Sequence, residues 1–211
     1  MNKPILLLFS GGLDSTYLLY KHLKEGNQVY AVYNQIRNND LQYKAELVAI
    51  KNIEKYFQKE LKETKSEISY ESNYELFNGN NSILFQQIPG HISTIINFIR
   101  KDIYEVQIGY TANDDVIPYL DDIKKIYYSY QSLFDHKLPP LRFPLKKLKK
   151  WQSYKELPDE LKNYICFCPN SKVKHNKIIP CGNCEKCYQL KMIGKFDIQS
   201  DEIEKRYFIK K

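Results

Sequence analysis

The chain has 211 residues, of which 43% are hydrophobic and 27% are charged, and its formal net charge is +7. These values are typical of a soluble globular protein with one core, and they exclude a low-complexity chain. No apolar stretch approaches the roughly 20 residues of a membrane-spanning helix, and the apolar run at residues 5–9 has no signal-peptide cleavage site after it. We therefore expect a cytoplasmic protein with no membrane partner. The positive charge fits a phosphate-bearing ligand, nucleic acid or a solvated lysine surface equally well.

Short apolar runs alternate with longer amphipathic stretches along the N-terminal two-thirds of the chain. This pattern is typical of a parallel-sheet α/β fold. A turn is expected at Pro89-Gly90, because these two residues disfavour regular structure. In chain order, the pattern predicts a strand at 5–9, a helix from 13 to 23, a strand at 28–33, a helix at 41–59, a helix at 92–100, a strand at 104–110, a helix at 119–134 and a short strand at 141–144.

A glycine loop, residues 10–16, separates the first predicted strand from the first helix and reads Ser-Gly-Gly-Leu-Asp-Ser-Thr. Paired glycines let the backbone turn tightly, and the amides that open the following helix favour an anion. The hydroxyls add donors, whereas Asp14 fits a Mg²⁺ ligand or a helix cap. A plain capped helix is the alternative, but the full string in this context favours a phosphate site. The predicted nucleotide-binding residues are Phe9, Ser10, Gly11, Gly12, Leu13, Asp14, Ser15 and Thr16.

All five cysteines follow residue 165, a clustering that favours a metal site over a disulfide framework. Three of them have Cys-x-x-Cys spacing: Cys181, Cys184 and Cys187. The fourth ligand is Cys166, Cys168 or, more weakly, His175. Four thiolates make a closed structural Zn²⁺ site, with an iron–sulfur cluster, a redox pair and free buried cysteines as the alternatives.

The glycine loop resembles the PP-loop of the N-type ATP pyrophosphatases. Together with the Pro-Cys-Gly-x-Cys-x-x-Cys string that begins at Pro180, it makes nearly the whole chain similar to the 7-cyano-7-deazaguanine synthase (QueC) family. The resemblance favours Cys166 as the first zinc ligand, because the family's metal cysteine often precedes a proline by three residues, and Pro169 stands there. We predict an adenine nucleotide alpha hydrolase-like, Rossmann-like α/β domain at 1–163, a four-cysteine zinc-binding segment at 164–200 and a polar tail at 201–211.

Other strings extend the resemblance. Residues 108–114 are similar to a strand-end Ile-Gly-x-x-x-x-Asp motif, and residues 144–150 to a Pro-Leu-x-x-Leu-x-Lys motif that implies a lysine near the ATP phosphates. Gln35 and Pro89-Gly90 match further family positions. Taken alone, Lys150 is more often a solvated surface lysine, and only the resemblance favours a role for it. The alternatives for Asp114 and Pro89-Gly90 are a loop cap and an ordinary turn. The predicted catalytic residues are Asp14, Ser15, Asp114 and Lys150.

The resemblance implies that ATP, Mg²⁺ and Zn²⁺ are the cofactors and that the chain forms a homodimer. It also implies adenylation of 7-carboxy-7-deazaguanine and conversion with ammonia to the nitrile preQ0 or its amide. His91-Ile92 stands where the family has Arg-Asn, and no Tyr-Pro-Asp-Cys-Arg string follows Asp114, so the acceptor is open. A QueC-like enzyme of an antiphage or DNA-modification system, which transfers a deazaguanine to a protein or nucleic acid, is the second reading. A zinc-ribbon nucleic-acid-binding module is the third.

Overall fold

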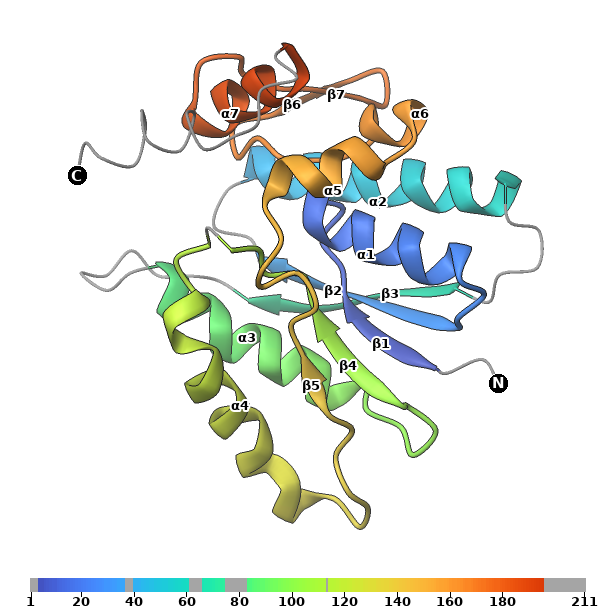
Figure 1. Cartoon of the computed structure of the whole chain (residues 1–211), viewed down its shortest axis with the longest axis vertical. Helices are drawn as coiled ribbons and strands as arrows, with labels where there is room; N and C mark the ends of the chain where they lie inside the picture. The colour runs from blue at the N-terminus through green and yellow to red at the C-terminus, as the bar shows by residue number, and fades with distance from the viewer. Residues whose placement is uncertain (1–3, 37–39, 61–65, 75–82, 113, 196–211) are drawn as a thin grey trace.

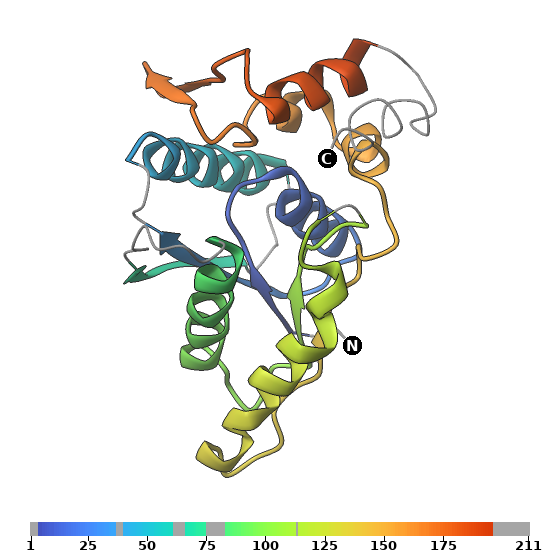
Figure 2. The same cartoon turned by 90° about the vertical axis from the view of Figure 1, so that its left-hand side faces the viewer.

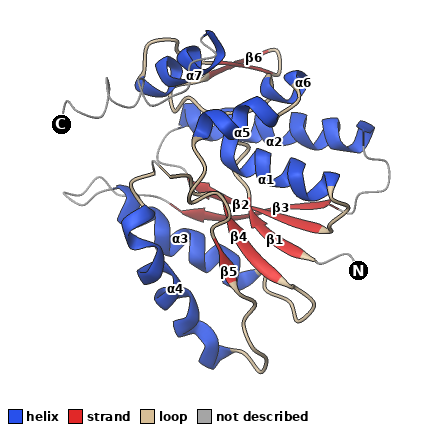
Figure 3. Cartoon of the chain, viewed as in Figure 1, coloured by secondary structure: helices blue, strands red, loops and turns tan. Residues whose placement is uncertain are grey.

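The computed structural model describes residues 4–36, 40–60, 66–74, 83–112 and 114–195. Five parallel strands form the main sheet in the order β3-β2-β1-β4-β5 (Figures 1 and 3). The strands are β1 Ile5–Leu8, β2 Val29–Ile36, β3 Ser66–Tyr74, β4 Glu105–Ile108 and β5 Leu141–Arg142. The chain runs outward from β1 to β2 and β3 and then returns to the other side of β1. The order of the strands therefore reverses between β1 and β4, which is where open α/β sheets bind ligands.

Helices cover both faces of this sheet. One face carries α1 Leu13–Lys24 and α2 Asp40–Glu60, and α5 Lys150–Glu156 packs on α1 (Figure 1). The opposite face carries α3 Ile83–Asn97 and α4 Leu120–Ser129, as the turned view in Figure 2 also shows. Because side chains alternate along a strand, β1 contributes Leu7 to the first core and Leu6 and Leu8 to the second. The predicted parallel α/β architecture is confirmed.

A small C-terminal unit, which we call the cysteine segment (residues 166–195), lies above α2 and α5 (Figure 1). It comprises the antiparallel hairpin β6 Lys172–Lys174 and β7 Lys177–Ile179 and the helix α7 Glu185–Lys195. The hairpin contacts α2, and α6 Asp159–Lys162 precedes the segment. Short 3-10 helices at Ile117–Tyr119 and Tyr130–Leu133 flank α4. The predicted tail at 201–211 lies outside the described residues.

Two expectations about local structure were wrong or incomplete. The expected turn at Pro89-Gly90 is corrected, because α3 runs through both residues. Ile88, Ile92 and Ile95 are buried, and α3 packs against β2, so burial of this face outweighs the local preference of proline. The strand β3 was not anticipated from the sequence. Among the described residues, no helix is long and apolar enough to cross a membrane.

Candidate active site

The glycine loop leaves β1 and turns into α1. Gly11 has φ +69°, and a Cβ built on it would lie 2.9 Å from the Cβ of Ala49 in α2. Only glycine is free of strain in this left-handed conformation, and only glycine lets α2 approach so closely. Ser15 Oγ accepts from the amide of Ser10 (3.3 Å) and donates to the carbonyl of Gly12 (3.3 Å). The loop is therefore held by its own hydroxyls and by the helix behind it.

The amides that open α1 point an uncompensated positive potential into the loop. The first turn-closing hydrogen bond of the helix is Thr16 N to Gly12 O (3.0 Å), and no side chain caps the helix at Gly12. Within the described part of the chain, the amides of Leu13, Asp14 and Ser15 have no acceptor. Three such donors at a helix N-terminus form an anion site.

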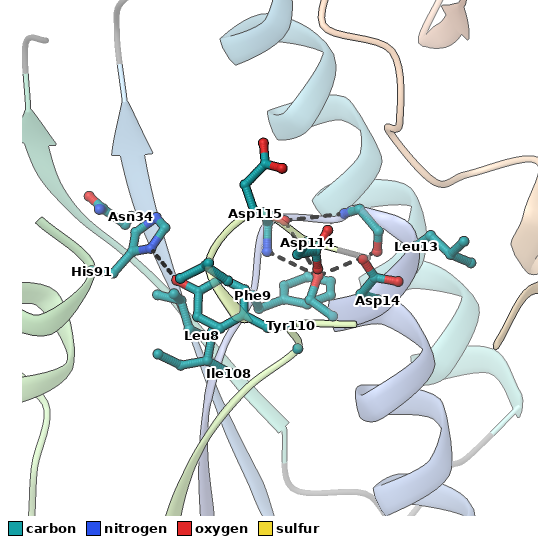
Figure 4. Close-up of a pocket in the computed structure, with 15 residues that line it drawn as sticks. Leu8, Phe9, Leu13, Asp14, Asn34, His91, Ile108, Tyr110, Asp114 and Asp115 are labelled. Atoms are coloured by element: carbon teal, nitrogen blue, oxygen red, sulfur yellow. Dashed lines mark hydrogen bonds between the residues drawn. The ribbon is translucent and has the colours of Figure 1, made fainter. Parts of the chain in front are cut away.

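A pocket of about 350 Å³ opens beside these amides, at the carboxyl ends of β1, β2 and β4. Figure 4 shows His91 and Asn34 on one side of it and Leu13 and Asp14 on the other. Its volume lies within the range of small-molecule sites, and its position is the strand-order reversal described above. Six of the eight predicted nucleotide-binding residues line it: Phe9, Ser10, Gly12, Leu13, Asp14 and Ser15. The other two do not line it: Gly11 contacts α2, and Thr16 is fully buried.

Lys150, the first residue of α5, lies between two carboxylates from different elements. Its Nζ is 3.2 Å from Asp14 Oδ2 and 2.9 Å from Asp114 Oδ1. Asp114 is held in turn by the amide of Thr111 (2.7 Å) and by its hydroxyl (3.0 Å). The structure thus joins three of the four predicted catalytic residues through direct contacts. Ser15, the fourth, lies one residue along α1 from Asp14.

The charges in this cluster are unbalanced, because two carboxylates share one ammonium. Burial acts to lower the pKa of Lys150, but Asp14 and Asp114 together raise it, so the lysine stays charged. Burial raises the pKa of Asp14 and the nearby Asp114 adds to this, while Lys150 opposes it. Asp14 Oδ1 is buried and has no hydrogen-bond partner among the described residues. An oxygen with this environment fits a ligand for a hard divalent cation, which would supply the missing positive charge.

The wall opposite the loop is aromatic and neutral. His91 Nδ1 is 3.4 Å from Tyr110 Oη, and the Tyr110 ring stacks on Phe143 at 5.8 Å between centroids. Burial lowers the pKa of His91 to about 4, so the imidazole is uncharged at neutral pH. This face can stack on a heteroaromatic ring and hydrogen-bond to its edge, and no lysine or arginine is among the described residues that line the pocket.

Sequence reasoning had missed several pocket residues. Asn34, Tyr110 and Asp115 line the pocket, whereas Gln35, which the resemblance had singled out, does not. Neighbouring residues of a strand face opposite sides of the sheet. Matching the family's glutamine to Gln35 was therefore one residue away from Asn34, the β2 residue that faces the pocket. Tyr110 and Asp115 lie within or next to the strand-end motif, so that motif carried the signal for them.

Four cysteine sulfurs form a compact group, which we call the cysteine cluster: Cys168, Cys181, Cys184 and Cys187. The sulfur of Cys168 is 3.5 Å from that of Cys181 and 3.7 Å from that of Cys184, and the sulfurs of Cys181 and Cys187 are 3.8 Å apart. A tetrahedral zinc site with Zn–S bonds of about 2.3 Å has sulfur–sulfur edges of about 3.8 Å. The amides of Cys181 and Gly182 donate to sulfurs of the cluster (3.4 and 3.3 Å), which favours thiolates. The donor set therefore fits zinc.

The expectation that Cys166 is the fourth ligand is corrected, because Cys168 takes that position. The amide of Cys166 donates to the carbonyl of Gly11 (2.8 Å), which fixes the residue against the glycine loop. Its thiol packs in the core formed with α1 and α2, where burial raises its pKa to about 12. His175, the weaker candidate, lies outside the cluster.

The fold and the site define a class of protein. A parallel sheet, a Ser-Gly-Gly-x-Asp-Ser turn after β1 and a pocket at the strand-order reversal are the features of a PP-loop, Rossmann-like nucleotide-binding domain.

The comparison with protein families agrees. Residues 4–83 match the family model described as queuosine biosynthesis protein QueC, so the chain is QueC-like over this region, which includes the glycine loop. The match supports an ATP-using enzyme of the PP-loop superfamily with a role, in broad terms, in queuosine biosynthesis. It ends before β4, Lys150 and the cysteine cluster. A search of curated proteins found no match.

Proposed function

We propose that this chain is an ATP-dependent enzyme that adenylates the carboxylate of 7-carboxy-7-deazaguanine and converts it with ammonia to the amide or to the nitrile preQ0. The observation that carries the proposal is the convergence of the free α1 amides and the Asp14–Lys150–Asp114 cluster at an open pocket. The amides and the lysine provide positive potential for phosphates, and the neutral aromatic wall provides a surface for a purine-like ring.

The chemistry requires an activated carboxylate, because an oxide is a poor leaving group and AMP is a good one. A carboxylate oxygen attacks the α-phosphorus of ATP, the bond to the β-phosphate oxygen breaks, and pyrophosphate leaves. Ammonia then attacks the acyl carbon, loses a proton, and displaces AMP to give the amide. A second ATP activates the amide oxygen, which departs with AMP as the nitrogen loses its protons and the nitrile forms.

The residues have separate roles in these steps. The amides of Leu13, Asp14 and Ser15 hold the leaving pyrophosphate, and Lys150 neutralises the charge that grows on it. Asp114, fixed by Thr111, positions the lysine. Asp14 Oδ1 would hold Mg²⁺, which shields the phosphates when bound. Zinc in the cysteine cluster would hold the C-terminal segment in place, because four thiolates leave no position for water.

Mass spectrometry on the purified protein tests the proposal. The chain is incubated with Mg-ATP, ammonium and 7-carboxy-7-deazaguanine, and AMP, pyrophosphate, amide and nitrile are measured. We expect AMP formation that depends on the acid, with amide or nitrile as the product. Absence of AMP with every combination of substrates would refute an ATP-pyrophosphatase role.

The neutral His91 favours one alternative, because the QueC motif places an arginine at this position. A site that lacks this cation is suited to a different acceptor, and we propose as the second candidate a relative that delivers the deazaguanine to a protein or nucleic acid. It predicts AMP formation that requires the macromolecule and a mass increase on it. A nucleic-acid-binding module without ATP turnover, the third reading, predicts salt-dependent binding and no AMP. We further propose a homodimer, which size-exclusion chromatography with light scattering would test.

A further inference from the structure

A second cavity, of about 180 Å³, lies on the other side of the glycine loop from the main pocket. Gly12, Leu13 and Asp14 line both cavities, so the first turn of α1 stands between them. Lys186 and Gln189 of α7, in the cysteine segment, form the outer wall of the second cavity. Lys150 of α5 also lines this cavity. The function proposed above uses the first cavity together with Lys150, which lines the second, and it gives α7 no role.

The lining of the second cavity brings a further positive charge, Lys186, close to the Asp14–Lys150–Asp114 cluster. This lining includes two lysines, Lys150 and Lys186, and one carboxylate, Asp14. Burial raises the pKa of Asp14, and the charge of Lys186 acts on this carboxyl in the opposite sense, as that of Lys150 does. Lys186 forms no ion pair with a carboxylate of the described residues. A phosphate group bound at the α1 amides is therefore within the field of both ammonium groups.

We propose that Lys186 is a phosphate-binding residue that contacts, from the cysteine segment, the pyrophosphate held by the glycine loop. This inference rests on the proposed ATP-pyrophosphatase function. It adds a residue that comes from outside the α/β domain and that lies beyond the part of the chain matched by the QueC family model.

The position of Lys186 makes the metal relevant to this contact. The residue lies between Cys184 and Cys187, both members of the cysteine cluster, at the start of α7. A metal bound by these thiols would hold the first turn of α7, and with it the backbone of Lys186, in place. At the other end of the segment, the Cys166 amide is bonded to the Gly11 carbonyl. The cysteine segment therefore meets the glycine loop at two points: through the Cys166 backbone at Gly11, and through Lys186 at the second cavity.

Titration calorimetry with magnesium pyrophosphate tests the contact directly. The variants are Lys186→Met, Lys186→Arg and the matched control Lys174→Met, an exposed lysine of β6, on the part of the segment that packs against α2. Lys186→Met should bind magnesium pyrophosphate about tenfold more weakly than the wild type, because it loses one charge-assisted contact to phosphate. Lys186→Arg should restore most of the affinity, because guanidinium also binds phosphate. Lys174→Met should bind as the wild type does. Zinc content and melting temperature confirm that each variant is folded.

The outcomes separate this inference from the function beneath it. Equal affinities for Lys186→Met and Lys174→Met, in a protein that binds pyrophosphate and forms AMP, would overturn the role of Lys186 and leave the function standing. A wild-type protein that neither binds pyrophosphate nor forms AMP would overturn both. A selective loss in Lys186→Met, reversed by arginine, supports the inference. Removal of zinc should then reduce pyrophosphate affinity in the wild type and have little further effect in Lys186→Met.

Discussion

Replacing Gly11 with alanine tests whether α2 holds the glycine loop from behind. Gly11 has φ +69°, and an added Cβ would lie 2.9 Å from Ala49 Cβ and 3.3 Å from two atoms of Ile50. Gly26 provides a matched control, because it has φ +75° and an added Cβ would meet nothing within 4 Å. Both substitutions impose the left-handed conformation on alanine, but only Gly11→Ala also forces the loop and α2 apart.

The expected losses in the free energy of unfolding follow from the left-handed conformation and from the clash with α2. The left-handed conformation costs alanine about 1–2 kcal/mol relative to a right-handed one, so Gly26→Ala should lower the free energy of unfolding by about that amount. Overpacking adds about 1–3 kcal/mol, and Gly11→Ala should therefore lose about 2–5 kcal/mol in total. For a chain of this size, each kcal/mol lowers the melting temperature by about 2–4 °C.

Urea and thermal unfolding of the two variants measure the difference, with ATP cleavage as a second readout. Gly11→Ala should lose ATP cleavage because the amides behind the pocket shift, whereas Gly26→Ala should keep it. Adding Ala49→Gly removes the nearest contact, so the double variant should lose less stability than the sum of the single changes. Equal losses for Gly11→Ala and Gly26→Ala, with no rescue by Ala49→Gly, would refute the close packing of α2 on the loop.

Three further predictions concern the charged cluster and the cysteines. Lys150→Met should reduce AMP formation about 10²–10³-fold, the usual effect of losing one positioned charge-stabilising group. The control is Lys147→Met, which changes an exposed lysine. Equal rates of AMP formation in the two variants would argue against a catalytic role for Lys150. Because burial raises the pKa of Asp14 in the folded protein, the stability this group contributes is present at acidic pH and lost as pH rises through its raised pKa. In the absence of Mg²⁺, Asp14→Asn should therefore raise the melting temperature at neutral pH, with a gain that shrinks toward acidic pH, while it abolishes ATP cleavage; a lower melting temperature at neutral pH would contradict this. Cys168→Ser should remove bound zinc, measured by elemental analysis, and Cys166→Ser should retain it; the reverse pattern would contradict the placement of Cys168 in the cluster.

Much of this fold could be predicted from the sequence because buried parallel strands are short apolar runs. Residues 5–9 and 104–110 stand out in this way, and β1 and β4 lie there. The edge strand β3 reads Ser-Glu-Ile-Ser-Tyr-Glu-Ser-Asn-Tyr and has no such run, so hydrophobicity could not reveal it. Its pairing with β2 sets its structure, and that pairing is a tertiary property.

The site was predictable where function depends on local spacing and less so where it depends on distant contacts. The glycine loop and the Cys-x-x-Cys repeat are local, and both lie where the sequence placed them. The choice between Cys166 and Cys168 depended on a hydrogen bond to Gly11, 155 residues earlier by sequence number, which no spacing rule contains. Likewise, only the folded chain shows that Lys150 meets both Asp14 and Asp114.

Gly109, at the end of β4, lies against the start of α1, where an added Cβ would be 3.1 Å from the backbone carbon of Asp14. With Gly11 pressed on α2, the phosphate end of the pocket thus rests on two positions that have no room for a side chain. A side chain at either of these positions is blocked by backbone or by α2, whereas the opposite wall of the pocket is made of the side chains of His91, Asn34 and Tyr110. An enzyme built in this way can keep its use of the nucleotide and acquire a new acceptor.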